Sequence, residues 1–272
     1  MEGAENLGDR RALDEKKEMF EATVNVLRTA GCVFAEEEAG LLLSEADSLE
    51  RLTEMIEKRK AGLPIEHIIG WTEFCGYRIE VNPGVFVPRR RTEFLALQAV
   101  KIASPGDVLV DMCCGTGAVA AVLAKKLEAI DIYAVDIDPR AVSNAMINLT
   151  AGHVLEGDLF ESLPAELLGR VNVIAANAPY VPTERMAVLP AEARLHEPLI
   201  ALDGGQEGLD IQRRVVKEAL PWLAEGGHLL METSMKQAKK TEEIFSLFGL
   251  APKKILSKEL DVTVVIGQKT GG

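Results

Sequence analysis

The 272-residue sequence lacks any long apolar run, and basic residues are in short supply. No stretch approaches the roughly 18 consecutive apolar residues that a membrane-spanning helix needs. The 30 Lys and Arg residues stand against 42 Asp and Glu residues, which gives a net charge of −12. Without a long apolar run we expect no membrane association. Because binding to a nucleic-acid backbone requires basic surface, we also expect no stable nucleic-acid binding.

Cysteine is sparse as well, with only four residues. Cys32, Cys75, Cys113 and Cys114 show neither the spacing of metal ligands nor the density of a disulfide framework. The first twenty residues, MEGAENLGDRRALDEKKEMF, are polar and acidic, unlike a secretory signal. The sequence therefore predicts a reduced, cytoplasmic protein without a metal site.

Residues 1–64 predict a small helical domain. Phe20, Val24 and Leu27 recur at helical spacing, and Gly31 follows as a stop signal. The segment EEEAGLLLSEADSLERLTEMIEKRKAG adds further short helices. Such a domain either covers one side of a larger domain or docks a partner.

Residues 65–88 have a different composition. In IIGWTEFCGYRIEVNPGVFVP, aromatic and β-branched residues alternate around Gly76 and around the turn signal Asn82-Pro83-Gly84. This pattern predicts a β-hairpin that links two domains.

Residues 89–272 alternate strand-like and helix-like segments. Alternation of this kind requires crossover connections, so it predicts an α/β domain with a largely parallel sheet and helices on both faces. The strand-like segments are DVLVDM, DIYAVDI, VNVIAAN, HLLMET, KILSKE and VTVVIGQ; the helix-like segments are AVAAVLAKKL, PRAVSNAMINL, GLDIQRRVVKEALPWLAEGG and MKQAKKTEEIFSLFG.

Two turns of this domain indicate a ligand that contains a nucleoside. VLVDMCCGTGAVAAVL combines a strand, a glycine turn at Gly115 and Gly117, and a helix start, where backbone N–H groups can bind a ligand. Asp136, at the tip of the next strand, can accept hydrogen bonds from both ribose hydroxyls. Each feature alone is also compatible with a packing turn or a helix cap, but the pair is stronger evidence than either.

A dinucleotide would fit the same geometry. The turn CCGTG, however, lacks the final glycine of the G-x-G-x-x-G pattern. Asp111, at the end of the first strand, suits a cationic ligand, and Asp158 in EGDLF can accept from an adenine amino group, although a surface aspartate is an equal interpretation. Three carboxylates at successive strand ends favour S-adenosylmethionine, which carries a sulfonium and an ammonium group.

The order of the motifs resembles the protein N5-glutamine methyltransferase family. The matching segments are GLPIEHIIGWTEFCGYRIEVNPGVFVPRRRTEFL, VDMCCGTGAVA, AVDIDPRAV, GDLF, NAPYVP and EARLHEPLIALDGGQEGLD. The resemblance implies a class I, Rossmann-like fold with a seven-stranded, mostly parallel sheet. It also implies transfer of a methyl group from S-adenosylmethionine, with S-adenosylhomocysteine as product, to a glutamine amide nitrogen in the Gly-Gly-Gln loop of a peptide-chain release factor. The release factor would dock partly on the N-terminal domain.

In this resemblance, Asn177-Ala178-Pro179-Tyr180 is the reaction centre. An amide nitrogen is a poor nucleophile, so acceptors for its two N–H groups, the Asn177 side-chain carbonyl and the Ala178 backbone carbonyl, would fix it and stabilise the charge that develops on it. Pro179 would stiffen the loop, Tyr180 would pack against the flat amide, and Phe86 matches a position near the substrate pocket. The residues implied to bind the cofactor are Asp111, Cys113, Cys114, Gly115, Thr116, Gly117, Asp136, Ile137, Asp158, Leu159 and Asn177.

The sequence departs from the family pattern at several positions. Ala178 replaces the first proline of Asn-Pro-Pro-Tyr, Cys113 replaces a glycine of the cofactor turn, and Arg90 and Arg91 replace a proline and an acid. The alternatives are therefore the same chemistry on another peptide or a small molecule, or a cofactor-binding scaffold without turnover.

Overall fold

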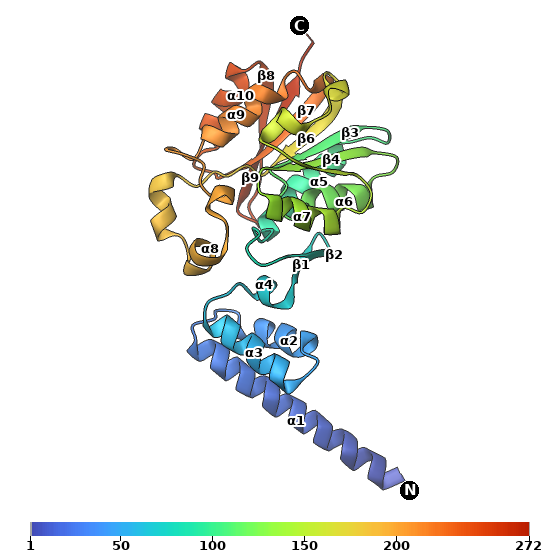
Figure 1. The fold of residues 1–272 in the computed structure, drawn as a ribbon, viewed down its shortest axis with the longest axis vertical. Helices are drawn as coiled ribbons and strands as arrows, with labels where there is room; N and C mark the ends of the chain where they lie inside the picture. Colours follow the sequence, from blue (N-terminus) through green and yellow to red (C-terminus); the bar gives the residue numbers. More distant parts are fainter. Residues whose placement is uncertain (1, 272) are drawn as a thin grey trace. The chain divides into compact units, whose positions relative to one another are not determined.

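The structure, a computed structural model, describes residues 2–271, with side chains described for residue 11 and for residues 13–271 (Figure 1). The chain separates into two compact units, Met1–Gly70 and Trp71–Gly272. Within the described residues, no helix combines the length and the apolar character needed to cross a membrane.

The first unit is helical. Val24, Leu27, Leu42 and Met55 are among the residues that form its core, with apolar positions spaced at helical intervals as the sequence predicts. The first helix ends just before Gly31, which has a left-handed backbone (φ 92°) that favours glycine. The helices are α1 (Glu2–Thr29), α2 (Ala35–Glu45), α3 (Leu49–Lys60) and α4 (Ile65–Ile69).

A buried ion pair crosses this helical core. The Arg59 guanidinium of α3 donates through Nε to Glu38 Oε2 at 2.6 Å and through Nη2 to Glu38 Oε1 at 3.0 Å. Both side chains are buried, and the bidentate geometry satisfies both carboxylate oxygens. The pair therefore fixes α3 against α2.

The hairpin of the second unit is shorter than the segment expected from residue 65. It consists of β1 (Trp71–Phe74) and β2 (Tyr77–Glu80), because helix α4 takes the first residues of that segment. Its two-residue turn is Cys75-Gly76, and both residues have positive φ (53° and 79°), as tight hairpin turns of this hand require. The Asn82-Pro83-Gly84 signal makes a separate turn after the hairpin, closed by a bond from Val85 N to Asn82 O at 3.2 Å.

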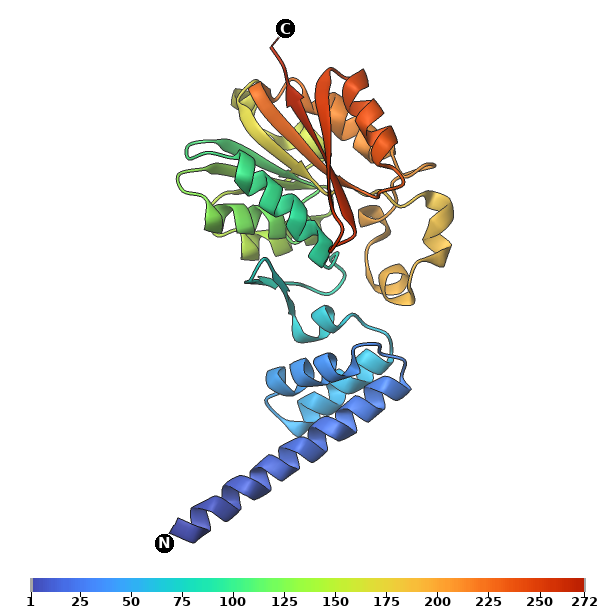
Figure 2. The same cartoon turned by 180° about the vertical axis from the view of Figure 1, so that it is seen from behind.

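A seven-stranded sheet forms the centre of the second unit (Figures 1 and 2). The strand order is β5-β4-β3-β6-β7-β9-β8, with β9 antiparallel to both of its neighbours and the other pairs parallel. This arrangement confirms the predicted class I fold. The strands are β3 (Val108–Met112), β4 (Asp131–Asp136), β5 (His153–Glu156), β6 (Val171–Ala176), β7 (Leu223–Thr233), β8 (Leu250–Ser257) and β9 (Val262–Lys269).

Helices cover both faces of this sheet and enclose two apolar cores. Successive strand residues point to opposite faces, so Leu109 contributes to one core whereas Val108 and Val110 contribute to the other. The first core is covered by α5 (Glu93–Ile102), α6 (Ala118–Lys126) and α7 (Pro139–Asn148); the second is covered by α9 (Asp210–Ala219) and α10 (Ala238–Leu247). The short helix α8 (Ala191–His196) belongs to the long connection between β6 and α9.

The helix expected over GLDIQRRVVKEALPWLAEGG is shorter than the sequence pattern suggested. It ends at Ala219, shortly before Pro221, and β7 begins at Leu223. Proline cannot donate a backbone hydrogen bond, so the helix does not continue through it. The start of β7 then bulges, because Val171 pairs with Leu223 but Val173 pairs with His228.

Candidate active site

Four residues with polar side chains line up across neighbouring strands at the carboxyl edge of the sheet. The parallel register pairs the ends of β4, β3, β6 and β7 residue by residue. Strand β3 also has its sequence neighbour β4 on one side and the later strand β6 on the other, which is the kind of switch point where open α/β sheets bind ligands. The last residues that these four strands pair with one another are Val135, Met112, Ala176 and Met231, so the residues that follow them at the edge are Asp136, Cys113, Asn177 and Glu232.

Asp111 lies just before this edge and caps the helix that follows the glycine turn. Its Oδ2 accepts a hydrogen bond from the Ala120 backbone N–H, in the first turn of α6, at 2.9 Å. Burial raises the pKa of Asp111 to about 8, and the nearby Asp136 carboxylate adds to the increase. The carboxyl group thus holds the start of α6 against the turn, and no cation pairs with it among the residues that the structure describes.

The two glycines of the turn are needed for different reasons. A Cβ on Gly117 would lie 2.9 Å from the Ala145 Cβ of α7, so this glycine permits close packing of two helices. A Cβ on Gly115 would meet nothing within 4 Å, so open space lies on that side of the turn. Cys113 has a left-handed backbone (φ 59°), which explains why glycine suits this position and implies local strain.

Asp136 ties the glycine turn to the end of β4. Its Oδ2 accepts from Gly115 N at 2.8 Å, and its Oδ1 accepts from Asp138 N at 2.9 Å. Burial raises the pKa of this carboxyl as well. A buried and a half-buried acid, with no cationic partner in the described part of the chain, stand beside the open side of a glycine turn and fit a ligand that carries positive charge and hydroxyl groups.

The remaining residues expected to bind the cofactor lie in this turn or shortly after the ends of β4 and β5. Cys114 N donates to Val135 O at 3.0 Å, and the buried Thr116 hydroxyl has no hydrogen-bond partner in the described part of the chain. Ile137 is 46% exposed immediately after Asp136. Leu159 is buried and has a strained left-handed backbone (φ 52°) at the start of the short helix η2 (Leu159–Ser162).

Asp158 has a partner that the sequence did not indicate. Arg214 of α9 donates through Nη1 to both oxygens of Asp158, at 3.0 and 3.1 Å. The same guanidinium donates through Nε to Glu218 at 3.2 Å. Helix α9 therefore holds the Asp158 carboxylate in place, and an adenine amino group would have to share it with Arg214.

The Asn177 side chain has a defined orientation. Its Nδ2 donates to the Thr92 hydroxyl oxygen at 3.2 Å, and Thr92 is buried at the end of the short helix η1 (Arg90–Thr92). With the nitrogen held by Thr92, the Asn177 carbonyl oxygen Oδ1 is left to accept a hydrogen bond. Ala178, the next residue, is buried in the core between the sheet and α9.

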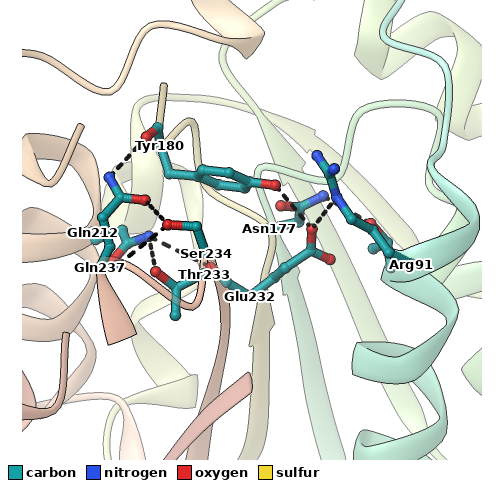
Figure 3. A network of polar contacts seen from close by, with 9 residues as sticks. Arg91, Asn177, Tyr180, Gln212, Glu232, Thr233, Ser234 and Gln237 are labelled. Atoms are coloured by element: carbon teal, nitrogen blue, oxygen red, sulfur yellow. Dashed lines mark hydrogen bonds and ion pairs between the residues drawn. The ribbon is translucent and has the colours of Figure 1, made fainter. Parts of the chain in front are cut away.

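Tyr180 is held at both its side chain and its backbone (Figure 3). Its hydroxyl donates to Glu232 Oε1 at 3.3 Å, and its carbonyl oxygen accepts from Gln237 Nε2 at 3.0 Å. Glycines pack directly on the loop: a Cβ on Gly208 would lie 2.2 Å from Tyr180 O, and one on Gly204 would lie 2.6 Å from Pro179 O. The segment DGGQEGLD thus provides a close support for the tetrapeptide.

Glu232 is the principal site residue that the sequence patterns did not reveal. It is 1% exposed, and it also pairs with Arg91, whose Nε lies 3.3 Å from Glu232 Oε1. Burial raises its pKa, while Thr92, Arg91 and Tyr180 oppose that increase. Its one sequence signal is an acid at the end of the otherwise apolar strand segment HLLMET.

Phe86 lies under a neighbouring cation rather than in a purely apolar setting. The Arg89 guanidinium stands 4.7 Å from the centre of its ring and also pairs with the buried Glu197. Glu197 further accepts from Val87 N at 3.3 Å. These contacts fasten the segment around Phe86 to the connection that follows the tetrapeptide.

The sheet order and this site define a class I methyltransferase, and comparisons with known proteins support that class. The family model described as Methyltransferase small domain matches residues 76–197. The methyltransferase of Pyrococcus furiosus has the same fold, with a TM-score of 0.56 and 18% identity over 80% of this chain and 98% of that one.

Curated relatives identify the family. The Release factor glutamine methyltransferase of Geobacter sulfurreducens is 35% identical over 199 residues, which are 72% of this chain and 69% of that protein. The 4-amino-L-phenylalanine/4-methylamino-L-phenylalanine methyltransferase of Streptomyces pristinaespiralis is 31% identical over 73% of this chain and 70% of that protein. The chain belongs to the release factor glutamine methyltransferase family, and the protein is an S-adenosylmethionine-dependent methyltransferase.

Proposed function

We propose that this protein methylates the side-chain amide nitrogen of a glutamine in the Gly-Gly-Gln loop of a peptide-chain release factor. The observation that carries this proposal is the orientation of Asn177, whose Nδ2 is held by Thr92 so that its Oδ1 can accept an N–H. The family of the chain and its Geobacter sulfurreducens relative support the same acceptor.

The chain's own groups would position the acceptor amide. One amide N–H would donate to Asn177 Oδ1 and the other to the Ala178 backbone carbonyl, while the Tyr180 ring would pack against the amide plane. These acceptors would stabilise the positive charge that develops on nitrogen, which lowers the barrier only if the geometry is fixed beforehand. The amide needs no general base before the transfer, because its extra proton is acidic enough to leave for water afterwards.

The residues proposed to hold S-adenosylmethionine are those around the glycine turn. Asp136 would accept from the ribose hydroxyls. Asp111, whose pKa is raised in the cofactor-free protein, would ionise beside the cationic end of the cofactor, because a nearby positive charge favours the carboxylate. Gly115 would leave room for the ligand at the turn. When bound, the cofactor supplies an activated methyl group on a sulfonium. The other proposed contacts are Cys113, Cys114, Thr116, Gly117, Ile137, Asp158, Leu159 and Asn177.

The wider setting of this activity is also part of the proposal. A release factor would contact Phe86 and the tetrapeptide with its loop, and it would dock partly on the helical unit. The net charge of −12 favours a protein partner over a nucleic acid. Because release factors act in translation, we propose a cytoplasmic location.

A small-molecule acceptor is the second candidate. Its support is the relative from Streptomyces pristinaespiralis, whose name describes methylation of an aromatic amine. The cation at Arg91, where the family pattern has an acid, also changes the surroundings of the acceptor site.

The two candidates are separated by offering both acceptors to the purified protein with methyl-labelled cofactor. Label transferred to a release factor, but not to 4-amino-L-phenylalanine, supports the first candidate. The opposite pattern supports the second. Cofactor binding measured by calorimetry, together with no label in either acceptor, would favour a scaffold without turnover.

A further inference from the structure

Glu232 is a buried carboxylate beside the acceptor loop, at a place where amide methylation requires no general base. Its Oε1 accepts from Tyr180 at 3.3 Å and pairs with Arg91, whereas its Oε2 is buried without a hydrogen-bond partner in the described part of the chain. A buried carboxylate oxygen without a partner destabilises a fold. Arg91, Tyr180 and the Thr92 hydroxyl are the neighbours that oppose this cost for Glu232.

The surroundings of Glu232 connect it to both polar residues of the tetrapeptide. It contacts Tyr180 directly, and the Thr92 hydroxyl, which helps to lower the pKa of Glu232, also accepts from Asn177. Arg91 and Thr92 are neighbours in η1, so a single short turn supplies both the counter-ion and the hydroxyl. Figure 3 shows Tyr180 and Arg91 approaching Glu232 from opposite sides.

The loop needs such support because of its sequence. Ala178 has no ring to fix its backbone, unlike a proline, so the loop conformation depends on contacts around it. The side-chain contact of Tyr180 with Glu232 and the backbone contact with Gln237 supply two of them.

We propose that ionised Glu232, paired with Arg91, is the positioning residue that holds Asn177 and Tyr180 ready for the acceptor amide. The proposal deepens the proposed function and rests on it for the identity of the acceptor. The same negative charge favours the positive charge that develops on the acceptor nitrogen. Protonation of Glu232 would weaken both effects.

The groups that face Glu232 predict how it titrates. Arg91 and Thr92 approach from η1 and Tyr180 from the loop after β6, and these three lower its pKa against the dominant effect of burial. Two other elements pack against Glu232. Gln212 of α9 donates to its backbone carbonyl at 3.4 Å, and Val264, its paired residue in β9, is apolar. Arg91 is therefore the cation through which the ionisation of Glu232 can be tuned.

The test uses the full chain without cofactor or acceptor. The protein has three tyrosines, so ring-labelled tyrosine gives a simple NMR spectrum in which Tyr180→Phe assigns the Tyr180 signal. We expect this signal to follow an acidic transition that disappears in Glu232→Gln. In Arg91→Gln, the midpoint should rise by about half a pH unit or more, because an opposite charge is lost.

Arg90→Gln is the matched control, since it removes the adjacent exposed cation. It should leave the midpoint unchanged. A Tyr180 transition that persists in Glu232→Gln, or a midpoint that does not move in Arg91→Gln, would overturn the proposal. Arg91 is 44% exposed, so its variant gives a result even if Glu232→Gln fails to fold.

Activity provides the second readout. With a release factor as acceptor, Glu232→Gln should lower kcat at least about tenfold. Its affinity for S-adenosylhomocysteine should stay within about twofold of wild type, because Asp136 and the glycine turn keep their proposed contacts and Asn177 is one contact among several. Arg91→Lys should recover part of the activity lost in Arg91→Gln. Full activity in Glu232→Gln overturns the positioning role. Absence of methylation by wild type refutes the proposed function instead, because the NMR titration needs no acceptor.

Discussion

Asn177 donates its side-chain Nδ2 to the hydroxyl oxygen of Thr92 at 3.2 Å, although 85 residues of sequence separate the two. This single contact decides which end of the Asn177 amide is available to an acceptor. A hydrogen-bond acceptor fixed in advance stabilises developing charge without reorganisation during the reaction. The end of β6 and the helix η1 therefore cooperate in building the acceptor site.

Replacing Thr92 should impair catalysis far more than cofactor binding. Thr92→Val keeps the volume of the side chain but removes the acceptor for Asn177 Nδ2, so the amide is free to rotate. We expect kcat to fall about tenfold to a hundredfold. The dissociation constant for S-adenosylhomocysteine, measured by calorimetry, should change by no more than about twofold, because Asp136 and the glycine turn keep their proposed contacts. Thr92→Ser keeps the hydroxyl and should retain most of the activity. Equal activity in the valine and serine variants would show that this hydrogen bond is not required.

The support of the acceptor loop by Gly208 can be tested against a matched glycine. Gly208 and Gly249 both have a left-handed backbone, with φ of 71° and 83°, so alanine is strained at either position. Only at Gly208 would the new Cβ meet the loop, 2.2 Å from Tyr180 O, whereas at Gly249 it would meet nothing within 4 Å. Both variants should lose about 1–2 kcal/mol of stability from strain.

The two alanine variants should differ more in methyl-transfer activity than in stability. Gly208→Ala should lose most of its activity, because the Tyr180 backbone has to move away from the new methyl group. Gly249→Ala should keep near-normal activity once its fold is confirmed by circular dichroism. If both variants methylate the acceptor equally well, the loop does not depend on its glycine support.

The buried Asp111 predicts the direction of one pH dependence. Its pKa is raised to about 8 in the folded protein, so between about pH 4 and pH 8 the folded state binds a proton that the unfolded state has released. This group therefore contributes a stability that decreases as the pH rises. The contribution amounts to at most about 1.4 kcal/mol per pH unit.

Asp111→Asn removes this titration while it keeps the shape of the side chain. Urea unfolding of the cofactor-free protein, measured at several pH values between 5 and 8, should show a flatter decline of the unfolding free energy in the variant than in wild type. Parallel pH profiles for the two proteins would mean that Asp111 titrates alike in the folded and unfolded states.

In the helical unit, the Arg59–Glu38 pair should be essential for stability. Arg59→Ala leaves a buried carboxylate without its bidentate partner, so we expect a loss of about 3–5 kcal/mol in the unfolding of this unit. Arg51→Ala is the control: Arg51 pairs with Glu54 at 2.9 Å on the exposed surface, where such pairs contribute about 1 kcal/mol or less. Helical circular dichroism in urea measures both effects, and similar losses would contradict the role of burial.

The sequence predicted the strand ends of the site because those signals are local. Asp136 and Asn177 follow apolar strand segments directly, and the glycine turn has its own short signature. Glu232 and Thr92 escaped prediction because their roles depend on strand register and on contacts across long sequence separations, such as the 141 residues between Arg91 and Glu232. The extent of helix α9 was misjudged because a continuous helical pattern hid the break at Pro221.

The most direct test is to map the methyl group on a release factor by mass spectrometry after incubation with wild type and with Asn177→Ala. Calorimetry must first show that the variant still binds S-adenosylhomocysteine. We predict a methyl group on the Gly-Gly-Gln glutamine amide with wild type and a yield at least about a hundredfold lower with the variant, since an acceptor for the charged amide is lost. A methyl group on another residue, or an equal yield from both proteins, would contradict the proposed function of the Asn177 loop.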